Sequence, residues 1–515
     1  MEDPILQNDI TNIDSNELGK LKDVDTDIKY NSQSEKKESK NISGLIKNIF
    51  LNNIYQFLII IVPLITTPYV SKVLQPAGVG ISSYTNSILT YFTMFAALGT
   101  VGYGTREIAR ARDDKHELSK AFWEIELITI FTSAVCLLGW IGVCFIYKKY
   151  QLYLFLWTFC IFGSLFDISW LFAGLEKYKY TVSINMAFKI ASCICIFIFV
   201  KTFDDLWKYV LIYSLSSMLG NLSMWVFLPK VLVKAKPDFH NLKKHFRETL
   251  IYFIPVVASV LYAVLDKTLI GAITQNENYS GQYESATKVI NLCKIVGFAA
   301  VVNVMSSRSN YLYKINAQER IKALTLGTLN IASTLSIAVS FGIVSVSEVF
   351  VPLFFGEGYE MTIVLMNILS PVIFLLSITD LCGGLYFIPA GKRLESAMFL
   401  IIGSTINLLF NIVLIKMMGP KGACISTLLS EMIIATLYLT YCKTITWIDL
   451  LKTIWKKIIA GCVMYIVLAF FAKLTISSPY VDLLLRVVIG ACVYFVVLYA
   501  LRDNVFKILK VLKKV

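Results

Sequence analysis

The sequence IYFIPVVASVLYAVLDKTLIG, residues 251–271, forms most of an apolar segment that runs from Thr249 to Ile273, near the midpoint of the chain. A segment of about 20 such residues is long enough to cross a bilayer as a helix. It nevertheless carries Asp266 and Lys267 side by side, and a charge at that depth costs about 3 kcal/mol on insertion scales. Because such charges are retained mostly where they face protein or water, the segment predicts a membrane helix beside a polar path.

The composition of the whole chain is that of a polytopic membrane protein. Of its 515 residues, 56% are hydrophobic and 16% are charged, against about 25% charged in soluble domains. The net charge of +13 could favour nucleic acid, but the basic residues are spread over many short loops, which is typical of a topology signal. This spread predicts no nucleic-acid partner. The 11 cysteines lie in apolar runs without ligand spacing, so we expect no metal, and no cofactor is expected either.

Fourteen apolar windows follow a polar N-terminal region. Residues 1–43 are rich in Asp, Glu, Lys, Asn and Ser and predict a disordered cytoplasmic tail. The windows predict an all-α polytopic membrane protein with about 14 transmembrane helices. They cover residues 48–72, 79–103, 121–147, 151–175, 181–201, 207–229, 249–273, 283–309, 323–349, 360–388, 396–416, 421–442, 455–475 and 479–501.

The charge of the loops predicts the orientation. Alternate loops are rich in Lys and Arg, whereas the loops at 274–282 and 350–359 contain neither. Since basic loops stay on the cytoplasmic side, both termini are predicted to be cytoplasmic. All loops are short, and no Gly-rich phosphate loop is found, which argues against an ATPase.

A weak internal repeat predicts two halves. The sequence GVGISSYTNSI (Gly78 to Ile88) is similar to YSGQYESATKVI (Tyr279 to Ile290), and each follows an apolar helix with an internal proline. A parallel repeat of this kind is typical of transporters built from two rocking bundles. We therefore predict six-helix bundles at 44–240 and 241–443, and two additional helices with a basic C-terminal tail at 444–515.

Charged residues inside the predicted spans are the candidate site. We interpret the cations as lining a wet cavity that stabilises an anionic group, and the acids as balancing them or binding a coupling proton or sodium ion. The cations are Lys189, Lys267, Lys288, Lys294 and, with the least weight, Arg308; the acids are Asp167, Asp266, Asp380 and Glu431.

Simpler interpretations stand beside this one. Asp167 and Lys189 are each about 12 Å from the cytoplasmic face and could form a structural ion pair. Glu284 and Lys288 can bridge on one helix face, and Arg308 can reach the headgroups from a helix end. Glu124 and Glu126 are predicted to be interfacial. His116, His240 and His245 fall in inner loops without a metal or nucleophile partner, so no catalytic site is predicted.

Several motifs, in order along the chain, carry a family resemblance. They are PLITTPYVSKVLQPAGVGISSYTNSI (63–88), LGTVGYGTREIARARDDKHELSKAFWEI (98–125), DISWLFAGLEKYKYTVSINMAFKI (167–190), LDKTLIG (265–271), GQYESATKVI (281–290) and FVPLFFGEGYE (350–360). This set resembles bacterial polysaccharide-repeat-unit flippases of the Wzx type, within the multidrug/oligosaccharidyl-lipid/polysaccharide exporter superfamily. The chain departs from the family pattern in its long polar tail and in SSRSN (306–310), where a proline is expected before the arginine.

The resemblance implies a fold and a function. The fold is two six-helix bundles around a central cavity plus two peripheral C-terminal helices. The function is to flip an undecaprenyl-diphosphate-linked oligosaccharide across the bacterial cytoplasmic membrane, for O-antigen or capsule assembly, without catalysis. The implied partners are this lipid-linked sugar, membrane lipids, and polysaccharide polymerase and chain-length proteins.

Other functions stay open at this point. A cation-coupled multidrug exporter should line its cavity with acids and aromatics rather than lysines. A flippase for the peptidoglycan lipid precursor, from the same superfamily, is an equally close alternative. A membrane-embedded polymerase or ligase should carry a sizeable outer loop with Arg or His, and a structural scaffold has no use for buried cations.

Overall fold

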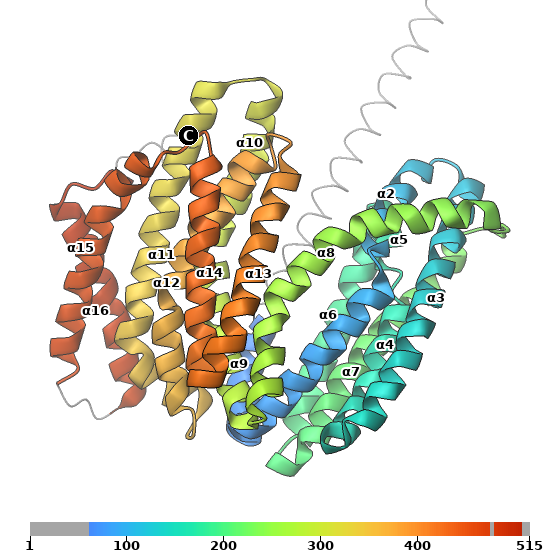
Figure 1. Ribbon diagram of the computed structural model, residues 1–515, viewed down its shortest axis with the longest axis horizontal. Helices are drawn as coiled ribbons and strands as arrows, with labels where there is room; N and C mark the ends of the chain where they lie inside the picture. The colour runs from blue at the N-terminus through green and yellow to red at the C-terminus, as the bar shows by residue number, and fades with distance from the viewer. Residues whose placement is uncertain (1–60, 474–477, 507–515) are drawn as a thin grey trace, which may run out of the picture.

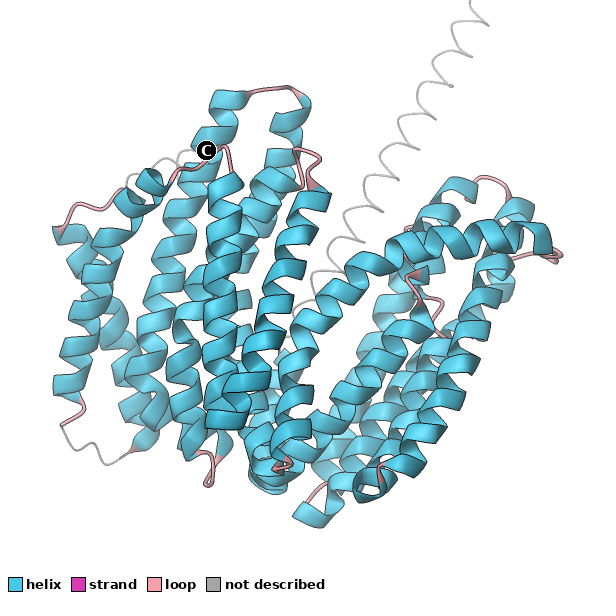
Figure 2. Ribbon diagram, in the orientation of Figure 1, coloured by secondary structure: helices cyan, strands magenta, loops and turns pink. Residues whose placement is uncertain are grey.

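The computed structural model describes residues 61–473 and 478–506. The predicted tail at 1–43, the start of the first predicted span and most of the basic C-terminal tail lie outside these ranges. Within them every regular element is a helix, and no strand occurs (Figure 2). Twelve of these helical segments are long and apolar enough to span a membrane, and they coincide one for one with the third to fourteenth predicted spans. The prediction of an all-α membrane protein is confirmed.

The first group of helices, as we call it, consists of residues 61–97 and α2 to α7. Residues 61–97 are helical but break at Gln75, where φ is +55°; Pro76 follows, so the run has two arms, 61–74 and 76–97. The others are α2 (Thr100–Ala111), α3 (Lys115–Ile146), α4 (Gln151–Leu165), α5 (Ser169–Gly174), α6 (Tyr178–Phe199) and α7 (Leu206–Met224), with short 3-10 turns at Lys148–Tyr150, Phe203–Asp205 and Trp225–Lys230.

The second group begins after α8 (Phe239–Thr274). It contains α9 (Glu277–Lys294), α10 (Ala300–Lys314), α11 (Gln318–Phe355), α12 (Glu360–Cys382), α13 (Arg393–Met418) and α14 (Pro420–Tyr441), with π-helical turns at Ile295–Ala299 and Gly383–Phe387. The last two helices, α15 (Trp447–Phe471) and α16 (Pro479–Ala500), pack against α11 at the edge of this group. One of their anchors is Tyr494, whose hydroxyl donates to the Thr334 carbonyl at 3.0 Å.

Local sequence signals explain where several helices begin. Asp114 and Asp238 cap α3 and α8 by accepting backbone N–H bonds from residues two positions on, and Asn276 caps α9 through the N–H of Tyr279. Thr446 and Asp449 form a reciprocal capping box at the start of α15. Such caps satisfy N–H groups that a helix cannot pair internally.

Two predicted spans are interrupted. The second, at 79–103, breaks at Leu98 and Gly99, whose φ angles of +40° and +75° end one helix before α2 starts. The fourth, at 151–175, breaks between α4 and α5, and Asp167 lies in this break. There Asp167 Oδ1 accepts the Ser169 N–H at 2.9 Å. The apolar composition of both windows concealed these breaks, because hydropathy does not report backbone angles.

The two groups converge at one end and diverge at the other (Figure 1). They meet at the end that carries the loops at 274–282 and 350–359, which the charge pattern predicts to be outer. The long curved helix α8 connects them. Its Phe239 end packs on α2 and α3 of the first group, and its Thr274 end packs on α13 and α9 of the second.

Candidate functional site

A cavity of about 480 Å³ lies between the two groups, inward of the end where they meet. Its walls come from both arms of 61–97, from α4, α6 and α7, and from α8 and α9. Four charged side chains line it, namely Lys189, Lys267, Lys288 and Glu284. The other polar lining consists of hydroxyl and amide groups, including Thr66, Thr67, Ser83, Asn86, Thr90, Asn185, Ser192, Ser216, Ser217, Tyr209, Tyr213 and Asn221.

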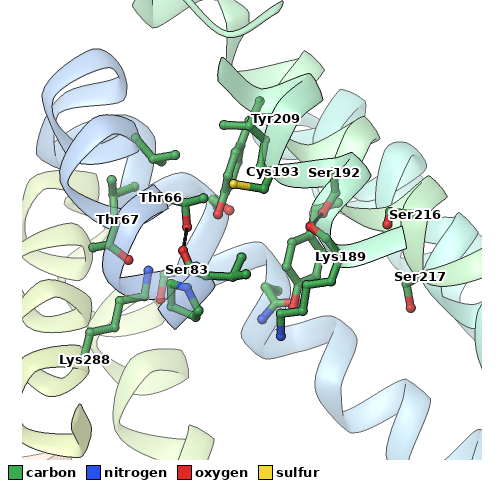
Figure 3. Close-up of a pocket in the computed structure, with 18 of the residues that line it drawn as sticks. Thr66, Thr67, Ser83, Lys189, Ser192, Cys193, Tyr209, Ser216, Ser217 and Lys288 are labelled. Atoms are coloured by element: carbon green, nitrogen blue, oxygen red, sulfur yellow. Dashed lines mark hydrogen bonds between the residues drawn. The ribbon is translucent and has the colours of Figure 1, made fainter. Parts of the chain in front are cut away.

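Lys189 approaches the cavity from α6, on the first group (Figure 3). Its side chain is half-buried, and it forms no ion pair with any described residue. The possible pair with Asp167 is therefore not formed, and Asp167 Oδ1 accepts the Ser169 N–H instead. Within the described part of the chain, Lys189 thus presents an ammonium group whose charge no neighbouring carboxylate balances.

Lys267 and Lys288 approach from the second-group side and share one carboxylate. Glu284 Oε2 lies 2.7 Å from Lys267 Nζ, and Glu284 Oε1 lies 3.4 Å from Lys288 Nζ. Glu284 Oε2 also accepts the hydroxyl of Ser83 at 2.8 Å. The predicted bridge between Glu284 and Lys288 is confirmed, and Lys267 joins it from α8. The three residues together carry a single net positive charge.

Asp266 points away from its neighbour Lys267. Its carboxylate is buried and accepts three hydrogen bonds, from Tyr283 Oη at 2.6 Å, Thr427 Oγ1 at 2.7 Å and Asn411 Nδ2 at 2.6 Å. Successive residues on a helix point about 100° apart, so one faces the second-group core and the other the cavity. Asp266 and Lys267 are adjacent in the sequence but therefore belong to two different sites.

The remaining predicted residues do not line the cavity. Lys294 pairs with Asp380 of α12 at 3.0 Å, with both side chains about 30% exposed. Glu431 of α14 is fully buried and accepts a short hydrogen bond from Tyr262, while its Oε2 has no partner among the described residues. Arg308 is exposed on α10. The structure thus brings Lys189, Lys267 and Lys288 together and leaves Lys294 and Arg308 outside.

Comparison with known proteins places this architecture in a family. The model of a family described as "Polysaccharide biosynthesis protein" matches residues 45–356. The chain belongs to this family. The match covers the motifs at 63–88, 98–125, 167–190, 265–271 and 281–290 and most of the last motif, so the resemblance drawn from them is confirmed.

Individual relatives agree with the polysaccharide biosynthesis family. A candidate O-antigen transporter of Escherichia coli (strain K12) is 23% identical over 410 residues, which cover 78% of this chain and 98% of the relative. A candidate flippase of low-salt glycan biosynthesis from Haloferax volcanii is 24% identical over 308 residues, or 58% of this chain and 63% of the relative. Among solved structures, the lipid II flippase MurJ in an inward closed conformation has a TM-score of 0.66 at 15% identity, covering 87% of this chain and 98% of that one. This last likeness concerns the fold.

One buried cluster in this family member escaped the sequence prediction. His245 Nε2 lies 2.9 Å from the Glu124 carboxylate, which is only 2% exposed. In the tautomer whose Nε2–H donates to Glu124, His245 Nδ1 accepts the hydroxyl of Tyr103 at 2.6 Å. Glu124 and Glu126, which were predicted to be interfacial, are both buried within the protein. His245 was placed in a loop because α8 was expected to start at about 249. Asp238, which caps α8, is the sequence signal from which the earlier start of this helix could have been predicted.

Proposed function

We propose that this chain flips an undecaprenyl-diphosphate-linked oligosaccharide repeat unit from the inner to the outer leaflet of the bacterial cytoplasmic membrane, by alternating access. It is a transporter and not an enzyme in this proposal, and it serves surface polysaccharide assembly. The observation that carries the proposal is the cationic cavity between the two groups, in which Lys189 has no carboxylate partner among the described residues.

The charge of the cavity suits a diphosphate. Its lining has three lysines and one glutamate, a net of two positive charges. In a phosphate diester each phosphate carries about one negative charge, so a diphosphate that joins lipid to sugar would neutralise this lining. The Asn, Ser, Thr and Tyr side chains around it can bond sugar hydroxyls, because they offer both donors and acceptors. An organic cation, the cargo of the rival drug exporter, would be repelled.

Alternating access follows from the arrangement of the two groups. The predicted bundles at 44–240 and 241–443 would rock against each other around the cavity, with 444–515 at the edge. The cavity lies inward of the contact between the groups, so the structure corresponds to an outer-closed state in this proposal. Both termini would lie in the cytoplasm. Polysaccharide polymerase and chain-length proteins are proposed as partners that receive the flipped unit.

The acids take different roles in this proposal. Asp266 and Glu431, buried in the second group, are the groups proposed to bind a coupling proton or sodium ion. Asp380 balances Lys294, whose pair lies outside the cavity. Asp167 shapes the break between α4 and α5. Lys294 and Arg308 would act at most along the approach to the cavity.

Purified protein in proteoliposomes tests the function directly. Three lipids are compared: a polyprenyl-diphosphate oligosaccharide, its monophosphate analogue and the peptidoglycan lipid precursor. Movement of the sugar is read by a lectin outside the vesicle. We expect flipping of the first lipid, loss of flipping in Lys189→Ala, and wild-type flipping in Lys179→Ala, which changes an exposed lysine of the same helix.

Three outcomes would overturn the proposal. They are export of an organic cation dye without movement of any of the lipids, preference for the monophosphate lipid, and movement of the peptidoglycan precursor alone. The last outcome would assign the chain to the precursor flippases.

A further inference from the structure

Two glycines at the starts of equivalent helices meet where the two groups touch. Gly80 lies near the start of the arm 76–97, and Gly281 lies near the start of α9. A Cβ on Gly80 would lie 1.8 Å from the Glu277 carbonyl oxygen, and a Cβ on Gly281 would lie 1.8 Å from the Pro76 carbonyl oxygen. Neither position can hold a side chain while the two helices touch here, because the obstacle is backbone in both cases.

The crossing of these two helices separates two spaces. On its inner side lies the cationic cavity, lined here by Val79, Ser83 and Glu284. On its outer side lies a second cleft, lined by Lys72, Gln75, Pro76, Asn278, Gln282, Gly356, Glu357 and Gly358. Pro76 and Val79 are three residues apart on one arm, so the barrier between cavity and cleft is about one helical turn thick.

Polar contacts between the groups surround the crossing. One turn inward, Ser83 donates to Glu284. Toward the outer side, Glu277 lies 2.6 Å from Lys149 Nζ and accepts from Tyr150 Oη at 3.0 Å, and Tyr359 Oη donates to the Ser71 carbonyl at 3.3 Å. These contacts can be exchanged for bonds to water when the groups separate, so they cost less to break than an interdigitated apolar seam.

We propose that the crossing of Gly80 and Gly281 is the outer gate of the transport path, and that the outer cleft receives the sugar on release. The inference rests on the proposed function for the identity of the cargo. Glu284 connects the cargo to the gate, since it binds Lys267 and Lys288 in the cavity and accepts from Ser83 across the crossing. A diphosphate on the two lysines repels the Glu284 carboxylate, and displacement of this carboxylate breaks its bond to Ser83.

Accessibility of the cavity from outside tests the gate without any cargo. Cys193 lines the cavity, and its modification by a membrane-impermeant maleimide in intact cells can be read by peptide mass spectrometry. We expect slow labelling in the wild type and several-fold faster labelling in Gly80→Ala or Gly281→Ala, because the added methyl group holds the crossing apart. Gly327→Ala is the matched control, since a Cβ there meets nothing within 4 Å.

A reversible lock gives a second test, which leaves Gly80 and Gly281 unchanged. The Cβ of Lys72 lies 3.8 Å from the position of a Cβ on Gly356, a separation that suits a disulfide. In Lys72→Cys/Gly356→Cys, oxidation should hold the outer side closed and abolish export, and a reductant should restore it.

The gate is overturned if the Gly80 and Gly281 variants, present in the membrane at wild-type amounts, label no faster than Gly327→Ala. Unchanged export after complete oxidation of the cysteine pair would overturn it as well. The labelling test needs no substrate, so it can fail while flipping of the diphosphate lipid stands. Conversely, Cys193 can be labelled faster in the glycine variants although the diphosphate lipid is not moved. That result would contradict the proposed function and leave the gate standing.

Discussion

The two walls of the cavity carry the same cation in different settings. On the first-group wall, Lys189 has no acidic partner among the described residues, whereas on the second-group wall Lys267 and Lys288 share Glu284. An unpaired ammonium group can give its full interaction to an incoming anion, but a paired one must first exchange its carboxylate. Lysines that look equivalent in the sequence therefore differ in how readily they bind a phosphate, and we expect Lys189, which is unpaired among the described residues, to bind it most readily.

The largest effect is expected from Lys189→Ala. Losing a hydrogen bond to a charged group costs about 1.5–3 kcal/mol, which is about a 10- to 160-fold loss of flipping at matched protein levels. Lys189→Arg should retain much of the activity, because the charge stays on α6. Export is measured as surface polysaccharide in a deletion strain. A Lys189→Ala chain as active as the wild type, beside an inactive Lys267→Ala chain, would reverse the comparison between the walls.

Asp266→Ala should lower stability, in addition to any loss of ion coupling. The substitution leaves the buried donors of Tyr283, Asn411 and Thr427 without their shared acceptor, at about 1–3 kcal/mol for each group left unsatisfied. A lower midpoint of thermal unfolding in detergent checks this expectation. Lys267→Ala is the control at the adjacent position, and its midpoint should change much less. Equal midpoints for the two variants would contradict the assignment of these neighbours to different sites.

Lys267→Ala or Lys288→Ala alone should reduce export only a few-fold. In each variant the remaining lysine keeps its bond to Glu284, and the cavity loses one charge. Adding Glu284→Gln to Lys267→Ala should recover part of the loss, since glutamine can still accept from Ser83. The double-mutant cycle measures the coupling, expected at about 0.5–3 kcal/mol for residues in contact. Additive effects would show that the shared carboxylate does not govern this wall.

Arg308→Ala should have the smallest effect. The side chain is exposed on α10 and lies outside the cavity, and surface substitutions usually change stability by less than about 0.5 kcal/mol. Export and membrane level should both match the wild type. A loss as large as that of Lys189→Ala would place the cationic path along α10 and not between α6 and α9.

Much of the fold could be predicted from the sequence, because hydropathy and loop charge report directly on what lipid and water accept. Twelve predicted spans coincide with helices that can cross a membrane. The breaks at Leu98–Gly99 and at Asp167 could not be predicted, since they depend on backbone angles inside apolar windows. The start of α8 was missed for a similar reason: its first turns are too polar to resemble a span, although Asp238 caps them.

The candidate site could be predicted only in part. The sequence identified Lys189, Lys267 and Lys288 as charged residues at membrane depth, and the cavity brings these three together. It could not separate them from Lys294, which pairs with Asp380 on a helix far along the chain. It also missed the buried cluster of Tyr103, Glu124 and His245, because burial of a polar residue near a helix end depends on which helix packs over it.

The sequence by itself determined that the segment at 249–273 crosses the membrane and carries two charges that need partners, because lipid offers none. The tertiary structure alone decided what those partners are. One helical step turns Asp266 into the second-group core and Lys267 into the cavity, and Gly80 and Gly281 meet at the end of that cavity where the two groups touch. Periodicity fixes the direction of a side chain only relative to its own helix, and the packing of the helices decides what lies in that direction.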